Sequence, residues 1–418
     1  MKKILITLII TLVMAVTVLC GCEKQTSNTT KQTTKAAETT TKEEITTTEG
    51  STYATYTIAV YDIDGEKLGE KTLSTEQYPT VLSALSEEFT LVASTTDYGT
   101  SITSINGSVV DKNWYLTIYE NDEYSMVGVD GLVIDDGDKF DFVSKCWNTV
   151  ESGYGTMDET DVLVDVAIYH YAKTYMKQLI AADTTFAGSN FWTYMAIGMM
   201  RDNLYDTNVF TVGDSNTALT ESITNADFSA FQATDWGKYY YTSKALGSLN
   251  NAFITAYEAH INEIANEFPA YGEYSIPFEI SPAKTLEITS TNLEAIISTD
   301  YMASTEYGVD GLAWQVACLQ LWDTYSKDVL VNFPLQDQGN ATSTAIELLV
   351  YAAFNESPRT EEADLVKTLM DTYYDADLQL VKYLTTDEGV NYSTNQIYAA
   401  LMAYKVSRDT KGAVNLFA

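Results

Sequence analysis

Histidine and cysteine are scarce in this chain, which has 418 residues but only two histidines and four cysteines. Zinc sites are built mainly from these two residue types at close spacing. Neither His170 nor His260 has a cysteine at such a spacing, and the chain contains no Gly-x-Ser-x-Gly nucleophile elbow and no phosphate-binding glycine loop. We therefore predict no catalytic residues, no metal site and no cofactor, and expect a protein that is not an enzyme.

Lysine and arginine are also scarce relative to the acidic residues. The 24 lysines and arginines stand against 58 aspartates and glutamates, which gives a formal net charge of −34. A surface with this excess of carboxylates repels phosphate backbones. The composition thus argues against nucleic acid as a partner, and against a protein that lies flat on anionic lipid.

The first residues have the pattern of an exported lipoprotein. Two lysines precede an apolar run from Ile4 to Leu19, which is too short to span a membrane and is typical of a signal peptide. Leu19-Cys20-Gly21-Cys22 then has the form of a lipobox, which ends in an acylated cysteine. We predict a lipoprotein signal peptide over residues 1–21, lipidation at Cys22, and a location on the extracellular face of the cell membrane. An ordinary cleaved secretory peptide remains the alternative.

A polar segment follows the predicted lipidation site. Residues 22–52 consist mostly of Thr, Lys, Glu, Gln and Ser. Such a composition cannot bury enough apolar surface to fold. We predict a disordered Thr-rich linker here, with a reach on the order of 30 Å. Beyond it only two cysteines remain, Cys146 and Cys318, which we expect as isolated buried thiols, with pairing left open.

Alternation of apolar and polar residues marks the stretch from 113 to 142. Trp114, Leu116 and Ile118 alternate with more polar residues, which is the period of a half-buried strand. Asn121-Asp122 follows, and both residue types tolerate the positive φ of a tight hairpin. The pattern predicts a strand that runs into a hairpin with this pair at its tip.

Two more strands are predicted after the hairpin. Leu132 and Ile134 indicate one strand, and Phe140 and Phe142 a closing strand. Asp135-Asp136-Gly137-Asp138 lies between them. These three carboxylates would also suit a cation, but a solvated turn has the same composition, and we favour the turn.

An earlier hairpin and a helix precede this stretch. Tyr56, Ile58 and Val60 alternate as a strand, and the Asp62-Ile63-Asp64-Gly65 sequence suits a turn into the next strand. No carboxylate closes a twelve-residue calcium loop here, so we favour turn chemistry. Pro79 then precedes apolar residues at helical spacing.

These elements resemble the small β domain that closes transcobalamin and intrinsic factor. The resemblance covers Tyr56 to Trp147 and implies a β-rich, β-grasp-like domain with one helix. The usual Asn-Gly of the hairpin is Asn121-Asp122 in this chain. We assign a transcobalamin-like β domain to residues 53–150.

Helical spacing replaces the strand pattern beyond residue 155. Residues 158–180 predict a long amphipathic helix, and polar loops are expected at 207–217 and 269–282. Several helices are apolar on nearly all faces, which is typical of buried helices. Their expected starts are near Phe191, Tyr239, Asp310, Ser343 and Thr394.

Alternation of these helices with amphipathic ones, such as residues 361–384, suggests an inner and an outer ring. The starts Asp-Gly-x-Ala-Trp at Asp310 and Thr-x-Gln-x-x-x-Ala-Leu at Thr394 resemble the α/α toroid of the terpenoid cyclase and protein prenyltransferase superfamily. We assign an all-α toroid to residues 156–418. The predicted fold class is thus multidomain α and β.

An acidic cluster of the cyclase type is missing from the helical half. The nearest sequence, Asp375-Ala376-Asp377, falls on a predicted outer helix. A carbohydrate-active toroid enzyme stays an alternative, with Asp310 and Glu347 as its two acids. Asp310 would serve equally as a helix N-cap. A non-catalytic adhesion or structural protein of the cell surface is the third class.

Aromatic and amide side chains at the helix starts favour binding without chemistry. If these starts surround one mouth, flat rings and polar groups would line it. The alternative for each aromatic residue is that it fills the core. The candidate ligand-binding residues are Tyr119, Asn121, Tyr124, Trp192, Tyr194, Tyr240, Asp310, Trp314, Asn395, Gln396 and Tyr398.

The combination of a toroid with this β domain resembles transcobalamin and intrinsic factor, which hold cobalamin between their two domains. Here the β domain comes first. The resemblance implies capture of a bulky ligand, cobalamin or a related corrinoid, for uptake, with hand-over to a membrane transporter. It places the hairpin from Tyr119 to Tyr124 on the β-domain side of the site.

Overall fold

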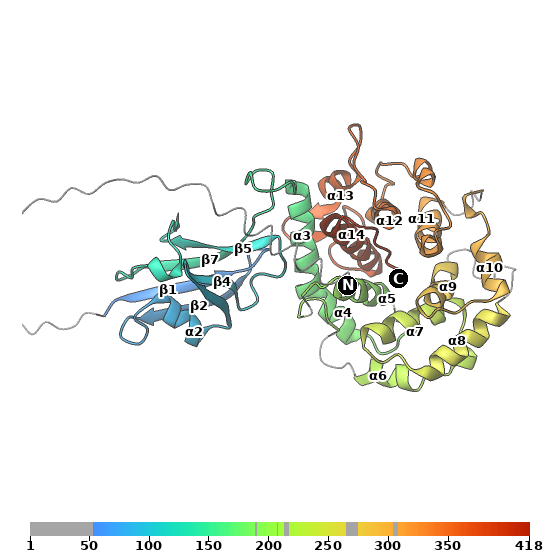
Figure 1. Cartoon of the computed structure of the whole chain (residues 1–418), viewed down its shortest axis with the longest axis horizontal. Helices are drawn as coiled ribbons and strands as arrows, with labels where there is room; N and C mark the ends of the chain where they lie inside the picture. Colours follow the sequence, from blue (N-terminus) through green and yellow to red (C-terminus); the bar gives the residue numbers. More distant parts are fainter. Residues whose placement is uncertain (1–52, 189, 207, 213–216, 265–274, 304–307) are drawn as a thin grey trace, which may run out of the picture. The chain divides into compact units, whose positions relative to one another are not determined.

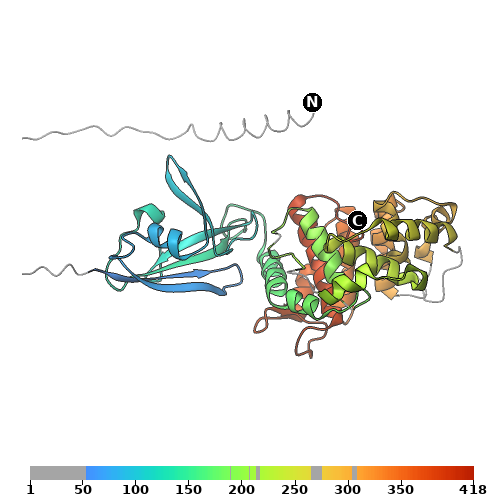
Figure 2. The ribbon, with the colours of Figure 1, turned by 90° about the horizontal axis from the view of Figure 1, so that it is seen from below.

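The computed structural model describes residues 53–188, 190–206, 208–212, 217–264, 275–303 and 308–418 (Figure 1). The predicted signal peptide, the lipidation site at Cys22 and the linker over 22–52 lie outside the described residues. Figures 1 and 2 show the strands gathered in the first part of the described chain and the helices in the second. No helix among the described residues combines the length and the apolar character needed to cross a membrane.

A five-stranded sheet forms the β-rich part, with strand order β2-β1-β7-β5-β6. The strands are β1 (Thr55–Tyr61), β2 (Lys67–Ser74), β5 (Trp114–Glu120), β6 (Glu123–Tyr124) and β7 (Lys139–Cys146). Strands β1 and β7 pair in parallel, whereas the other neighbours are antiparallel. This arrangement confirms the predicted small β-rich region.

Helix α2 (Val81–Glu88) supplies the cover for this sheet. Thr80 caps its N-terminus by accepting a hydrogen bond from the Ser83 amide. The buried face of α2 packs with Ile58 and Phe140 of the sheet in one apolar cluster. The sequence did not reveal the neighbouring hairpin, β3 (Leu91–Thr96) with β4 (Gly99–Ile105), whose side chains are mostly exposed.

The predicted hairpin tip at Asn121-Asp122 is confirmed. Both residues have positive φ, 53° and 69°, and β5 pairs with β6 across them. The Asn121 side chain donates to Asp138 (2.9 Å) and accepts from the Lys139 amide (3.0 Å). Asparagine therefore ties the tip to the start of β7 as well as permitting its left-handed backbone.

The strand predicted at Leu132 and Ile134 is wrong. A 3-10 turn occupies Val129–Gly131, and the chain from 132 to 138 has no strand partner. Leu132 and Ile134 still pack on the apolar cluster of the sheet and α2. Their alternation thus reflects one-sided packing of an extended segment, which has the same period as a strand.

Six helices of the second part contact one another in a closed cycle, which we call the inner ring: α5–α7–α9–α11–α12–α14 and back to α5 (Figure 1). They are α5 (Phe191–Asp202), α7 (Ala233–Ala245), α9 (Ile276–Thr285), α11 (Gly308–Leu319), α12 (Ala341–Phe354) and α14 (Tyr392–Thr410). Helix α12 shows the expected all-round burial, since its residues from Ala341 to Ala353 are all buried.

The remaining helices lie along the outside of the inner ring (Figure 1). They are α3 (Glu159–Tyr171), α4 (Lys177–Ala182), α6 (Thr217–Thr224), α8 (Asn251–Glu263), α10 (Thr291–Ile297) and α13 (Leu365–Tyr373). A π-helical turn over Ala172–Met176 joins α3 to α4, so the long helix predicted at 158–180 is continuous. Cys146 and Cys318 are free thiols.

The outer helix predicted over 361–384 is too long. After α13 the chain forms a short hairpin, β8 (Tyr374–Asp375) with β9 (Leu380–Val381). The Asp375 carboxylate accepts from the amides of Asp377 and Leu378, which makes a turn in place of another helical turn. The Asp375-Ala376-Asp377 sequence therefore lies in a turn.

Helix α9 was missed because the segment 269–282 reads as a loop. Pro277 lies at the start of α9 and Pro282 inside it. An interior proline costs a helix about 3 kcal/mol. Residues Ile276 to Ala283 are all buried within the inner ring, so tertiary packing offsets that cost.

A buried ion cluster joins the β-rich part to the helices. The Lys405 side chain of α14 is fully buried, and its ammonium lies 3.0 Å from Asp111, 2.8 Å from Asp165 and 2.9 Å from Asp409. Asp111 precedes β5, whereas Asp165 belongs to α3. One cation therefore links three segments that are distant in sequence, and Arg408 adds a contact of 2.7 Å to Asp165.

Removal of the Lys405 ammonium should destabilise the protein strongly. We expect Lys405→Met to lower the free energy of unfolding by about 3–5 kcal/mol, because it leaves Asp111 without an ion pair and leaves Asp165 and Asp409 with Arg408 as their cation. Urea unfolding followed by circular dichroism measures the change. Lys284→Ala, at an exposed position on α9, should change stability by less than about 0.5 kcal/mol. Equal stability of the two variants would contradict the role of the cluster.

Candidate functional site

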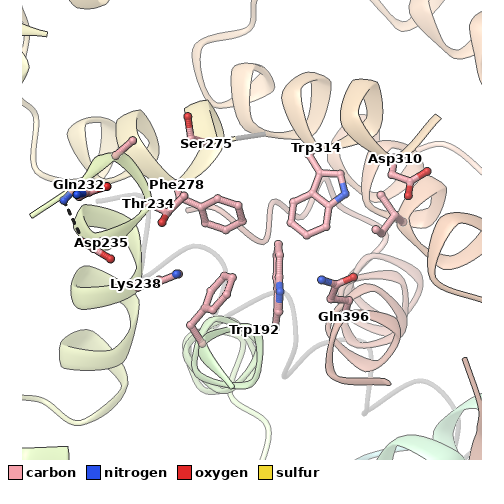
Figure 3. A pocket seen from close by; sticks show the side chains of 13 residues that line it. Trp192, Gln232, Thr234, Asp235, Lys238, Ser275, Phe278, Asp310, Trp314 and Gln396 are labelled. Atoms are coloured by element: carbon pink, nitrogen blue, oxygen red, sulfur yellow. Dashed lines mark hydrogen bonds between the residues drawn. The ribbon is translucent and has the colours of Figure 1, made fainter. Parts of the chain in front are cut away.

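A cavity of about 480 Å³ lies at the N-terminal ends of the inner-ring helices (Figure 3). Every helix of the ring contributes to its wall: Phe191 and Trp192 from α5, Lys238 from α7, Phe278 from α9, Asp310 and Trp314 from α11, Ile346 from α12 and Gln396 from α14. Most of these residues lie in the first two turns of their helices, so the closed cycle of helices brings six chain segments to one place.

Four aromatic side chains form one wall of the cavity, and we call them the aromatic group: Phe191, Trp192, Phe278 and Trp314. The ring centroids of Trp192 and Trp314 lie 3.9 Å apart at an interplanar angle of 73°. Phe278 meets Trp192 edge-on at 5.0 Å. Edge-to-face packing fixes the rings against one another, so the apolar surface is preformed.

The Lys238 ammonium stands over this group, 5.6 Å from the centroid of the Phe191 ring. Among the described residues no carboxylate lies within ion-pair distance of it. Asp235, one turn earlier on α7, accepts a hydrogen bond from the Gln232 amide (3.0 Å) and completes the cap of that helix. Lys238 therefore offers an unpaired positive charge to the cavity.

Asp310 lines the cavity, and a second acid, Glu347, is buried behind the lining residue Ile346. Asp310 lies in the first turn of α11 and not at its N-cap, and its carboxylate has no hydrogen-bond partner in the described part of the chain. Glu347 follows Ile346 on α12, is fully buried, and neither of its oxygens has a hydrogen-bond partner there. Burial raises the pKa of Glu347 to about 8, and the charge of Asp310 adds to this shift.

Four predicted ligand-binding residues are placed in the core and do not line the cavity. The Tyr194 hydroxyl donates to Asp183 (2.8 Å), and Tyr240 is buried. Asn395 accepts from the Tyr171 hydroxyl (2.8 Å), and Tyr398 stacks on the Tyr171 ring at 3.9 Å. The polar atoms of Asn395 and Tyr398 are used within the fold, which leaves them little capacity for a ligand.

The β-hairpin residues also lie away from this cavity, whose lining residues all fall between Phe191 and Gln396. Tyr119 and Tyr124 pack edge-on with ring centroids 6.0 Å apart, and Tyr124 is largely exposed. Asn121 is engaged at the hairpin tip. The structure thus brings together Trp192, Asp310, Trp314 and Gln396 of the predicted set.

The sequence analysis missed most of the other lining residues, among them Lys238 and Phe278. Helix α7 begins at Ala233, six residues before its predicted start, so Lys238 was not counted near a helix start. Its acidic third residue, Asp235, is a start signal that would have corrected this. Phe278 belongs to α9, whose two prolines concealed the helix.

Comparison with known proteins adds one finding in the β-rich part. The model of a family described as a domain of unknown function (DUF4430) matches residues 79–143, from the start of α2 into β7. No curated protein matches the chain. The match does not extend to the inner ring or its cavity.

The raised pKa of Glu347 gives a prediction for stability. The pKa in the folded state, about 8, exceeds the ordinary 4.5, so the folded protein keeps a proton that the unfolded chain releases between these values. The stabilisation is complete below the lower value and is lost as the pH rises through the upper one.

We expect the wild type to lose stability relative to Glu347→Gln between pH 5 and 8, by at most about 1.4 kcal/mol per pH unit. Unfolding by urea at a series of pH values measures this difference. The matched control is Glu361→Gln, at an exposed position, which should show no such trend. A constant difference between wild type and Glu347→Gln would refute the raised pKa.

Proposed function

We propose that this chain is a binding protein that captures a ligand with a flat apolar face and a polar edge in the cavity of the inner ring. The observation that carries the proposal is the convergence of four aromatic rings with the polar side chains of Lys238, Asp310 and Gln396 on a single cavity. Its volume of about 480 Å³ lies in the range of small-molecule sites, roughly 300–1,000 Å³.

The aromatic group and the polar groups have separate parts in this proposal. In this proposal a ring of the ligand packs against the parts of Trp192 and Trp314 that line the cavity, where an aromatic contact is worth about 0.5–1.5 kcal/mol beyond the area it buries. Gln396 and Asp310 accept hydrogen bonds from amides or hydroxyls at the edge of the ligand. Stacking gives affinity and the hydrogen bonds fix orientation.

Cobalamin or a related corrinoid is the ligand that we propose first. The macrocycle is flat and carries amide groups around its edge, which matches the two kinds of surface in the cavity. The resemblance of the β-rich part to transcobalamin also supports it, since the matched family is associated with transcobalamin-like domains. A whole corrinoid exceeds this cavity, so in our proposal one edge of the macrocycle enters it.

Lipidation at Cys22 would place this capture at the cell surface. In our proposal the acyl anchor and the Thr-rich linker keep the ligand close to the membrane, where an uptake transporter receives it. Two or more acyl chains are needed for a durable anchor. The linker composition supports this part of the proposal, because a polar chain of about 30 residues lets the binding part range over the surface.

Titration of the full chain in mild detergent with cyanocobalamin, followed by calorimetry, tests the binding function. We expect micromolar or tighter affinity, weakened at least about tenfold by Trp192→Ala or Trp314→Ala, because each removes a stacking face. Trp192→Phe, which keeps a ring, should bind more tightly than Trp192→Ala. Tyr98→Ala, at a 94 % exposed aromatic residue of the β-rich part, is the control. If neither tryptophan substitution weakens the affinity, the binding site lies elsewhere.

Glycoside hydrolysis is a second candidate, and the Asp310–Glu347 pair favours it. One carboxyl group lies on the cavity, and the other is buried close enough for Asp310 to raise its pKa. A carboxyl group with a raised pKa, such as Glu347, can act as the acid of this reaction, with a second carboxylate as base or nucleophile. The pair therefore supplies the groups that such a reaction needs.

A panel of oligosaccharides incubated with the full chain distinguishes the two candidates. Hydrolysis that disappears in both Asp310→Asn and Glu347→Gln, and persists in Glu361→Gln, would establish the enzyme. The binding function predicts no turnover in any of these proteins.

A further inference from the structure

We propose that the cavity holds an anionic group of its ligand at Lys238, with the ring of the same ligand on the aromatic group. This inference rests on the proposed binding function and adds a charge requirement to it. The site would take a ring-bearing monoanion, in which a carboxylate, phosphodiester or sulfonate lies at one edge of a flat ring.

The first argument is that Lys238 has no counter-ion. The other lysines of the helical part that are not exposed all have carboxylate partners: Lys405 has three, Lys173 has Asp62 and Asp64, Lys244 has Asp202 and Lys382 has Asp375. The Lys238 ammonium instead stands over the Phe191 ring, where the attraction of cation and ring is modest. In a chain with a net charge of −34, Lys238 is thus an exception among the described lysines that are not exposed, since it lacks a carboxylate partner.

The second argument is the orientation of the six helices. Their N-terminal ends converge on the cavity. A helix N-terminus carries about half a positive charge and favours anions. The cavity therefore combines the ammonium of Lys238 with the positive ends of several helix dipoles, in a region that aromatic side chains partly shield from water.

The third argument is the separation of opposite charges across the aromatic group. In Figure 3 the two tryptophans stand between Lys238 on one side and Gln396 and Asp310 on the other. Asp235 lies on the Lys238 side, where its carboxylate accepts from the Gln232 amide at the cap of α7, so Lys238 is the only lysine and Asp310 the acid without a hydrogen bond among the described lining residues. An anionic group near Asp310 would be repelled, whereas donors such as hydroxyls or amides would be bound there. A ligand with an acid at one edge and donors at the opposite edge thus has one preferred orientation.

A pair of dyes that differ in charge tests this inference without knowledge of the natural ligand. 8-Anilinonaphthalene-1-sulfonate is an aromatic monoanion, and N-phenyl-1-naphthylamine is the same ring system without the sulfonate. We expect the full chain to bind the anionic dye at least about tenfold more tightly than the neutral one, since a hydrogen bond to a charged group contributes at this scale. Fluorescence titration measures both affinities.

Three variants assign that preference to Lys238. Lys238→Gln should abolish the difference between the dyes, Lys238→Arg should retain it, and Lys284→Gln, which changes the net charge equally outside the cavity, should leave it unchanged. Equal affinities in the wild type, or a preference that survives in Lys238→Gln, would overturn the anion site while leaving the cavity as a binding site.

Trp192→Ala separates this result from a failure of the proposed function. It should weaken the binding of both dyes, because both need the aromatic group. If Trp192→Ala changes neither affinity, the cavity is not a binding site for the dyes, and the proposed anion site is refuted as well.

Competition then identifies the source of the anion. Displacement of the anionic dye by cyanocobalamin but not by dicyanocobinamide, which lacks the nucleotide loop, would assign it to a phosphodiester. Displacement by glucuronate oligosaccharides but not by neutral glucose oligosaccharides would assign it to the carboxylate of an acidic sugar.

Discussion

The buried ammonium of Lys405 is the contact on which the arrangement of this protein depends. Lys405 is enclosed by carboxylates of α3, of α14 and of the segment before β5. Isolated charges are costly to bury, so the three acids and the lysine are stable only together. Because the acids come from both parts of the chain, the docking of the β-rich part and the position of the last inner helix are stabilised by the same interaction.

Closure of the inner ring is the second constraint, and it creates the cavity. Helix α14 packs against both α12 and α5, so the end of the chain completes a cycle that begins about 200 residues earlier. Around such a ring, residues near the helix starts meet at one end. This explains why Trp192 and Trp314, which are far apart in the sequence, have their ring centroids 3.9 Å apart.

Features that depend on local backbone chemistry could be predicted from the sequence. The Asn121-Asp122 turn follows from the tolerance of these residues for positive φ, and α2 from Pro79 and the helical spacing of the apolar residues that follow it. Which aromatic residues at the helix starts line the cavity could not be predicted from the sequence. Trp192 lines the cavity, whereas Tyr194 and Tyr398 lie in the core. When a helix is apolar on all faces, its sequence does not indicate which face is directed to the cavity. Lys238 was missed because the start signal at Asp235 was not used, and Phe278 because the existence of α9 depends on tertiary packing.

Helix α14 has its two functions at opposite ends. Gln396 lies on the cavity, and Asp409 belongs to the ion cluster with the β-rich part. Thirteen residues of helix separate them by about 20 Å. The ion cluster is therefore not part of the cavity wall, and under the proposed function a ligand would not need the two parts of the chain to move apart. Exchange at the cavity would then be governed by diffusion and by local side-chain motion, with no slow domain opening to limit it.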